Sequence, residues 1–313
     1  MNFKRNERGY KYDEVENQHL KLKDLKEKTR GLRIYRYLGK EDVPALPHPE
    51  FHVTRVRHDT DQDGLRGIRR DEGFKNPGRG ALLWWSPSVG KDDMESAEQR
   101  LLNASSTDRT EAQDRQSFLG KFATSPAFTG HSRLGSYRFT FPLEELLTAY
   151  SEQFCEGEPP VMRVLGTHLF AQQVMHVVLV HGPAHQEYSG HPLLPDDDPN
   201  AVCTFRDGRF IWRPEAMSGT HYYEFDENKM EARDAGPYPE FYVWDHVAVA
   251  LHVGDEMLNF DAGRLRENLR FCTTDSTDPI HLGGFEDAEE AEGIVQDLWP
   301  DIASPLEEDR GIQ

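Results

Sequence analysis

Three short segments carry side chains that could do chemistry together. The first holds His52, the second the pair Trp84–Trp85, and the third Glu240. They supply an imidazole, two aromatic planes and a carboxylate, which serve for hydrogen bonding, stacking and proton transfer in active sites. Each also has an ordinary structural explanation, because strand histidines are usually satisfied, tryptophan pairs usually pack, and a glutamate at the start of a strand is usually solvated. Their order along the chain and the residues that flank them are what indicate a shared functional site.

Each segment lies in a predicted strand. His52-Val53-Thr54 is followed by a short helix and then by Gly73-Phe74, and Pro239-Glu240-Phe-Tyr-Val-Trp-Asp245 enters a long apolar strand. The strand Leu82-Leu83-Trp84-Trp85-Ser86 presents successive side chains to opposite faces, so only one of the two tryptophans can face a cleft. We favour Trp85, which stands next to Ser86.

In this order, the three motifs resemble the ADP-ribosyltransferase superfamily, which includes the poly-ADP-ribose polymerases. In that family a strand with His-Gly-Thr precedes a helix and a Gly-Phe or Gly-Leu turn, and a second strand carries an aromatic residue. A later strand begins Glu-Tyr-ϕ-ϕ-Tyr-Asp, where ϕ is apolar. Here Glu240-Phe-Tyr-Val-Trp-Asp245 keeps the acid, the aromatic residue beside it and the closing aromatic–Asp pair.

The resemblance implies an enzyme that uses NAD as a substrate, through a His–aromatic–Glu cleft. Glu240 would stabilise the oxocarbenium-like state and help to deprotonate the acceptor, and His52 would hydrogen-bond a ribose hydroxyl. The residues implied to contact NAD are His52, Val53, Thr54, Trp84, Trp85 and Ser86, with Glu240 and His52 as the catalytic pair. The acceptor of ADP-ribose would be a protein, a nucleic acid or water.

Two departures from the family pattern leave alternatives open. Val53 stands where the family has a glycine, so its side chain must point away from the ligand. Tyr238 stands two residues before Glu240, where arginine-modifying members have Glu or Gln. The alternatives are a catalytically inactive module of the same fold that binds a nucleotide or a partner, and an unrelated intracellular interaction protein whose tryptophans belong to the core.

Other candidate sites have weaker support, and we expect no metal. Asp59–Gly64 begins like a calcium-binding EF-hand loop, but its twelfth position is Arg70, a cation where the loop needs a bidentate Glu. Five histidines lie between residues 168 and 191, and two of them, His181 and His185, are separated by a Gly-Pro-Ala turn instead of sharing a helix face. The chain contains neither a GxxxxGK[ST] nor a GxGxxG phosphate-binding loop.

Composition and charge restrict the partners. The 313 residues carry a net charge of −19, but residues 1–40 hold 12 Lys and Arg against 6 Asp and Glu, a balance of +6. The remainder therefore carries 24 against 49, or −25, which argues against general nucleic-acid binding. Three cysteines without a CxxC spacing, and no apolar run of roughly 18 residues, predict a cytoplasmic or nuclear protein without a membrane segment.

The order of predicted elements indicates an α+β fold in one elaborated domain. We expect a split antiparallel or mixed sheet with insertions, as the resemblance implies, over residues 50–300. Residues 1–49 are predicted to be a charged arm and linker, and residues 301–313 a tail. Specific expectations include a helix at 110–122, a helix begun by Pro142, and a hairpin turning at Asp207-Gly208.

Overall fold

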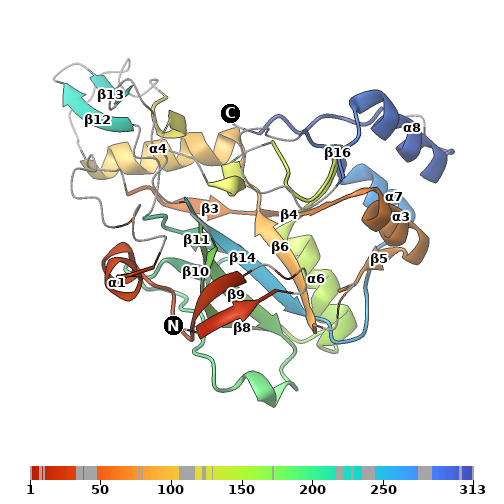
Figure 1. Ribbon diagram of the computed structural model, residues 1–313, viewed down its shortest axis with the longest axis horizontal. Helices are drawn as coiled ribbons and strands as arrows, with labels where there is room; N and C mark the ends of the chain where they lie inside the picture. The colour runs from red at the N-terminus through yellow and green to blue at the C-terminus, as the bar shows by residue number, and fades with distance from the viewer. Residues whose placement is uncertain are drawn as a thin grey trace.

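The protein is built around one large mixed β-sheet with helices packed against it (Figure 1). The computed structural model describes residues 2–6, 9, 11–32, 38, 48–76, 78, 80–105, 117–121, 125–128, 130–170, 173–215, 221–226, 229–234, 244–273, 284–302 and 305–311. This arrangement is the α+β single domain expected from the sequence.

The large sheet has nine strands in the order β1-β2-β8-β9-β14-β6-β4-β7-β16. Their bounds are β1 Asn2–Arg5, β2 Lys11–Glu16, β8 Val161–Phe170, β9 Gln173–His181, β14 Trp244–His252, β6 Leu82–Pro87, β4 Arg55–Thr60, β7 Tyr137–Pro142 and β16 Leu269–Phe271. Neighbouring strands are antiparallel except β9 and β14, which run parallel. The sheet is therefore mixed.

Strand β14 lies in the middle of this sheet, between β9 and β6. Its side chains alternate between the two faces, as a strand requires. Val247, Val249 and Leu251 are buried in the main hydrophobic core. Ala248 and Ala250 pack in a smaller cluster on the other face. An apolar strand buried on both faces explains the continuous hydrophobic run in this part of the sequence.

Three small sheets complete the strands. One has the order β10-β11-β3, with bounds Cys203–Arg206, Arg209–Trp212 and Phe51–Val53. The others pair β12 His221–Asp226 with β13 Lys229–Asp234, and β15 Leu258–Asn259 with β5 Gly73–Phe74. The hairpin between β10 and β11 turns at Asp207 and Gly208, both at positive φ (52° and 73°). This conformation is the one that Asp-Gly favours, so the predicted hairpin is confirmed.

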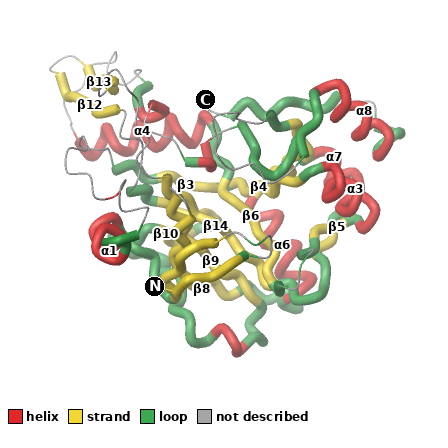
Figure 2. The backbone as a smooth tube through the Cα atoms, viewed as in Figure 1, coloured by secondary structure: helices red, strands yellow, loops and turns green. Residues whose placement is uncertain are grey.

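Helices cover the core and extend from the ends of the sheet. Their bounds are α1 Leu22–Lys28, α3 Gln62–Asp71, α4 Lys91–Ser105, α6 Leu143–Phe154, α7 Ala262–Glu267 and α8 Ala288–Leu298, with short 3-10 turns at η1 Leu119–Lys121, η2 Pro126–Phe128 and η3 Gln186–Tyr188. Figure 2 shows α3, α7 and α8 gathered at one end of the molecule and α1 at the other. Pro142 directly precedes α6, as predicted, and this helix buries Leu143, Leu146, Leu147 and Tyr150.

The N-terminal segment differs from the charged arm that the sequence predicted. Its strand β2 pairs with β8, and β1 pairs with β2, so the segment extends the sheet by two strands. The physical reason is that its charges are paired. The carboxylate of Glu14 is buried and accepts a hydrogen bond from His168 (2.8 Å), and it also forms an ion pair with Lys4. Composition alone did not show that these charges have partners.

Other expectations were met in part. The predicted strand at His52-Val53-Thr54 is β3, which ends at Val53, and a second strand, β4, begins at Arg55. The predicted helix 110–122 lies largely outside the described residues, and its described part includes the short turn η1. The predicted tail contacts the sheet, because the Asp309 amide donates to the Phe271 carbonyl at 2.8 Å.

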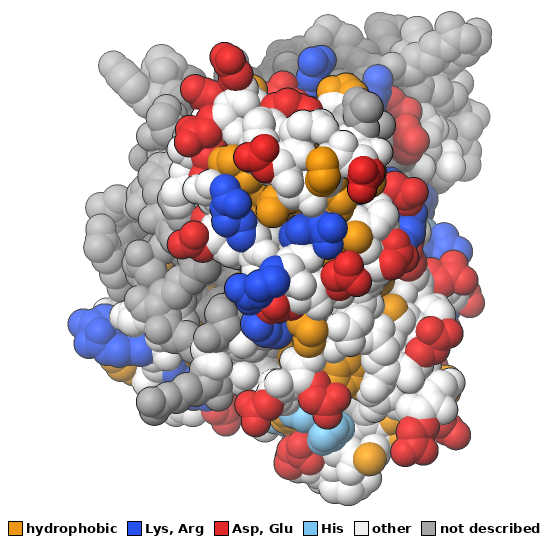
Figure 3. Space-filling view, turned by 90° about the vertical axis from the view of Figure 1, so that its right-hand side faces the viewer, with side chains coloured by type: hydrophobic (Ala, Val, Ile, Leu, Met, Phe, Trp, Pro, Cys, Tyr) orange, Lys and Arg blue, Asp and Glu red, His pale blue; other side chains and the backbone are white. Residues whose placement is uncertain are grey.

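The surface carries charges of both signs. On the face in Figure 3, acidic side chains are spread widely and Lys and Arg side chains lie among them. In the described part of the chain, no helix combines the length and the apolar character needed to cross a membrane.

Candidate functional site

Of the segments singled out in the sequence, the tryptophan pair lies on β6, between β14 and β4, whereas His52 lies on β3, in a separate small sheet. In the order β14-β6-β4, strand β6 is antiparallel to both of its neighbours, so β4 and β14 run in the same direction. The beginnings of β4 and β14 therefore reach the same edge of the sheet as the end of β6. We call this region, marked by Arg55, Ser86 and Asp245, the shared edge. His52 lies just before β4 in the sequence, and Glu240 just before β14.

The register shows how closely β4 and β6 meet there. Arg57 pairs with Ser86 and Val56 with Pro87. The amide of Ser88 then donates to the carbonyl of Arg55 at 2.9 Å. Arg55 is exposed and Ser86 half-buried. Arg55 is thus an exposed cation at the shared edge.

His52 is half-buried on β3 and is oriented by an acid. Its Nε2 lies 2.8 Å from Oε1 of Glu50, whose other oxygen accepts from Arg213 at 2.9 Å. Burial alone would raise the pKa of Glu50, but His52 and Arg213 outweigh burial and lower that pKa. Glu50 therefore stays ionised, and it holds the imidazole in place.

The other two residues of this motif differ in exposure. Val53 is fully buried in the core, so its side chain points away from any ligand at the surface, as the sequence required. Thr54 is exposed, and its carbonyl accepts from the amide of Leu143 at 2.8 Å. Thr54 therefore connects β3 to the start of α6.

A polar pocket of about 300 Å³ opens beside the His52–Glu50 pair. Its charged or titratable lining residues are Lys21, His48, Glu50, Arg213 and Glu215. The amide of Glu215 donates to Oδ2 of Asp245 at 2.9 Å. Asp245 is the last residue of the Glu240 motif, so this pocket connects the surroundings of His52 to the start of β14. Glu240 itself lies outside the described residues, in the segment 235–243.

The buried histidines near the start of β14 carry no charge at neutral pH. Burial lowers the pKa of His246 to about 3 and that of His176 well below its usual value. His176 lies 3.8 Å from Asp245 and is therefore a neutral neighbour of that carboxylate.

The structure reverses our preference between the two tryptophans. Trp85 is 1% exposed and packs against His58, Phe74 and Phe141, with ring centroids 5.0 to 5.9 Å apart. Trp84 is 37% exposed. With both faces of its indole in the core, Trp85 has no open face on which nicotinamide could stack. Any stacking role falls to Trp84.

His52 and Trp85 are not brought together. The residue beside Trp85 is His58, with ring centroids 5.4 Å apart, and His58 is six residues further along the chain than His52. At roughly 3.3 Å per residue, these six residues span at most about 20 Å, and the chain is interrupted at Thr54 between β3 and β4. His58 and Thr60 repeat the His-x-Thr pattern of His52 and Thr54, and they directly precede α3 and Gly73-Phe74. This closer spacing to α3 is a signal in the sequence that favours His58 over His52.

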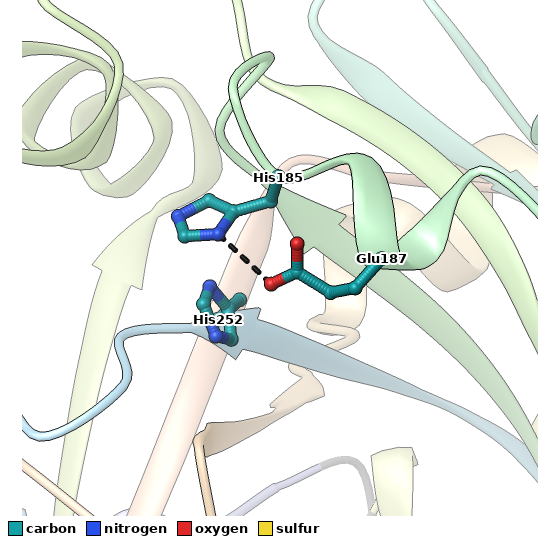
Figure 4. Close-up of side chains that lie close together, drawn as sticks. All are labelled: His185, Glu187 and His252. Atoms are coloured by element: carbon teal, nitrogen blue, oxygen red, sulfur yellow. Dashed lines mark hydrogen bonds and ion pairs between the residues drawn. The ribbon is translucent and has the colours of Figure 1, made fainter.

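A second group of side chains was not assigned from the sequence at all. His185, Glu187 and His252 converge beyond the far end of β14 (Figure 4). His185 had been considered for zinc only together with His181, and the structure instead brings it to His252, 67 residues away along the chain. The parallel pairing of β9 and β14 brings them together.

No protein-family model matches this chain, and no match was found among curated proteins or solved structures.

Proposed function

We propose that this protein binds NAD at the shared edge and breaks its nicotinamide–ribose bond, passing ADP-ribose to water, a protein or a nucleic acid. The observation that supports the proposal is that β4 and β14, the strands that follow His52 and Glu240 in the sequence, begin beside the end of β6, which holds the tryptophan pair. The order of the motifs along the chain resembles an ADP-ribosyltransferase, and the adjacency of β4, β6 and β14 in the sheet supports the proposal.

Glu240 and His52 have separate tasks in the proposed reaction. As the C–N bond between nicotinamide and ribose breaks, its electron pair leaves with nicotinamide and positive charge develops on the ribose. The carboxylate of Glu240 stabilises that charge. It then accepts the proton of the attacking hydroxyl, whose oxygen forms the new bond to the ribose carbon. His52, held by Glu50, binds a ribose hydroxyl.

Cations near the shared edge can bind the pyrophosphate of NAD. Arg55 is exposed at this edge, and Lys21 and Arg213 line the adjoining pocket. Guanidinium groups match phosphate oxygens in a bidentate arrangement, so arginine suits this task better than lysine. Arg55 is the best placed because Arg57, two residues later, is buried.

Binding without turnover is the second candidate function. It is favoured by the separation of His52 from Trp85, because the aromatic residue favoured from the sequence as the platform for nicotinamide then does not lie beside His52. The same pocket and the same cations would bind a nucleotide in either case.

Nicotinamide release from NAD by the purified full-length protein tests the first proposal. We expect Glu240→Gln to reduce the rate by about 100-fold or more, since a catalytic carboxylate contributes on that order. Glu256→Gln is the matched control, because Glu256 lies exposed in the turn after β14. Arg55→Ala should weaken NAD binding, and Arg66→Ala, an exposed arginine of α3, should not.

The outcomes separate the two functions. Release that depends on Glu240 supports the enzyme. NAD binding that depends on Arg55, with no release, supports the binding module. A protein that neither binds NAD nor releases nicotinamide contradicts both.

A further inference from the structure

The carboxyl ends of β9 and β14 bring together three side chains with metal-binding donor atoms. His185 and Glu187 come from the loop after β9, where Glu187 lies in η3, and His252 is the last residue of β14. Because β9 and β14 are parallel, with Val180 paired with Leu251, the chain leaves both strands at the same end. Figure 4 shows the three side chains pointing toward one another.

The distances suit a single small cation. One donor atom from each residue lies within 4.8 Å of the other two. Nδ1 of His185 is 3.0 Å from Oε1 of Glu187, and the His185 and His252 rings are 4.2 Å apart at their centroids. Ligand atoms of a tetrahedral zinc ion, bound at roughly 2.0–2.2 Å, are about 3.4 Å from one another. Small side-chain rotations would close this group around an ion.

The turn before His185 holds this residue in place. The amide of His185 donates to the carbonyl of Gly182 at 3.1 Å. A Cβ on Gly182 would lie 2.8 Å from the carbonyl oxygen of Phe154, so the close approach of the turn to α6 requires glycine. The histidine is therefore fixed by backbone contacts and not by its bond to Glu187 alone.

A nearby histidine is excluded from the ligand set by its own hydrogen bonds. Nε2 of His181 accepts from Arg163 at 3.0 Å, and its Nδ1 lies 2.8 Å from the Gly182 carbonyl. His252 differs from it. Its Nδ1 is closed off from solvent and has no hydrogen-bond partner among the described residues. A buried nitrogen of this kind calls for an explanation, and a bound ion at this cluster provides one.

We propose that His185, Glu187 and His252 form a zinc site with three protein ligands and an open fourth position. Two imidazoles and one carboxylate are a ligand set found in catalytic zinc sites, which keep one position for water, whereas structural sites are closed by four protein ligands. Glu187 lies on the exposed side of the cluster, so the fourth position faces solvent.

This site is separate from the shared edge. Asp245 and His252 stand seven residues apart on β14, or about 23 Å at roughly 3.3 Å per residue. The zinc proposal therefore does not depend on NAD chemistry.

Metal titration of the full-length protein after chelator treatment tests the proposal. We expect one equivalent of Zn²⁺ to bind, and Co²⁺ in its place to give the visible absorption of a four-coordinate ion. His185→Ala and His252→Ala should each weaken zinc binding by about 100-fold or more, since even the loss of a supporting residue costs about 10- to 100-fold. Glu187→Gln should weaken it by about 10-fold.

The controls are His131→Ala and Glu158→Gln, which remove an exposed histidine and an exposed glutamate elsewhere. His185 and Glu187 lie in a surface loop, so their variants decide the matter if His252→Ala fails to fold. The proposal is overturned if the wild-type protein binds no zinc, or if zinc affinity is the same in His185→Ala and Glu187→Gln as in the wild type. Neither result would alter the NAD experiments.

Discussion

The fully buried guanidinium of Arg138 donates to both carboxylate oxygens of Asp59, at 2.7 and 2.8 Å. A third bond reaches Asp309 at 3.0 Å, and a fourth reaches the carbonyl of His131 at 2.9 Å. Arg138 lies on β7 and Asp59 on β4, and the two residues are also direct cross-strand partners. One side chain therefore joins two strands of the large sheet to the C-terminal segment.

Asp59→Asn should destabilise the protein by about 3 kcal/mol, because it leaves a buried guanidinium without its main counter-charge. Urea unfolding of the purified protein measures this loss. Glu145→Gln removes the acid of a partly exposed pair with Arg264 and should cost less than about 1 kcal/mol. Equal losses in the two variants would show that burial does not set the strength of the Asp59 pair.

The same pair predicts how stability changes in acid. Burial alone would raise the pKa of Asp59, but Arg138 and Arg57 outweigh it and hold the pKa at about 2, below the usual 3.8. A lowered pKa stabilises the folded state above about pH 4, and this contribution is lost as the pH falls to about 2. The loss amounts to about 2 kcal/mol.

Unfolding measured from pH 5 to pH 2 in the wild type and in Asp59→Asn isolates the contribution of the ionised Asp59 to the free energy of unfolding. The difference between the two proteins should shrink by about 2 kcal/mol over that range. Asp309 faces the same guanidinium and titrates in both proteins, so its effect largely cancels. A constant difference would contradict the assigned pKa.

The two tryptophans should differ in their contribution to stability. Trp85→Ala removes a fully packed indole and should cost about 3 to 5 kcal/mol. Trp84→Ala removes a partly exposed ring and should cost about 1 kcal/mol. Thermal or urea unfolding measures both. The same two variants test whether a tryptophan stacks on nicotinamide. Trp84→Ala removes an accessible ring and leaves the core intact, so a loss of NAD binding in this variant would indicate stacking on Trp84.

Two buried threonines on the large sheet form a matched pair. The hydroxyl of Thr167 accepts from the Leu20 amide at 2.9 Å and donates to the Gln18 carbonyl at 2.7 Å. Thr167→Val should cost about 2 kcal/mol, because it leaves a buried amide unsatisfied. The hydroxyl of Thr140 is buried and has no hydrogen-bond partner among the described residues. Thr140→Val should be neutral or slightly stabilising.

If both valine variants unfold at the same urea concentration as the wild type, the N-terminal segment is not held by Thr167.

Local sequence patterns predicted the elements well where one short signal decides the conformation. Asp207-Gly208 predicted a hairpin, Pro142 predicted the start of a helix, and the apolar strand predicted after Glu240 corresponds to β14. Pairing between distant strands was not predictable in this way. The burial of Glu14 depends on His168, and the approach of His185 to His252 depends on β9 and β14 being neighbours. Such contacts are set by the topology of the chain, and no local pattern encodes them.

The central position of β14 determines when the large sheet can finish folding during synthesis of the chain. Strands β1, β2, β8 and β9 form one half of the large sheet and β6, β4, β7 and β16 the other, and β14 alone pairs with both halves. Sixty-two residues separate the end of β9 from the start of β14. Most of the chain has therefore been synthesised before the two halves of the sheet can join. Until then β9 and β6 are open edges with apolar side chains, which is the state most prone to aggregation. A chain that ends before residue 244 should therefore accumulate as insoluble material in cells.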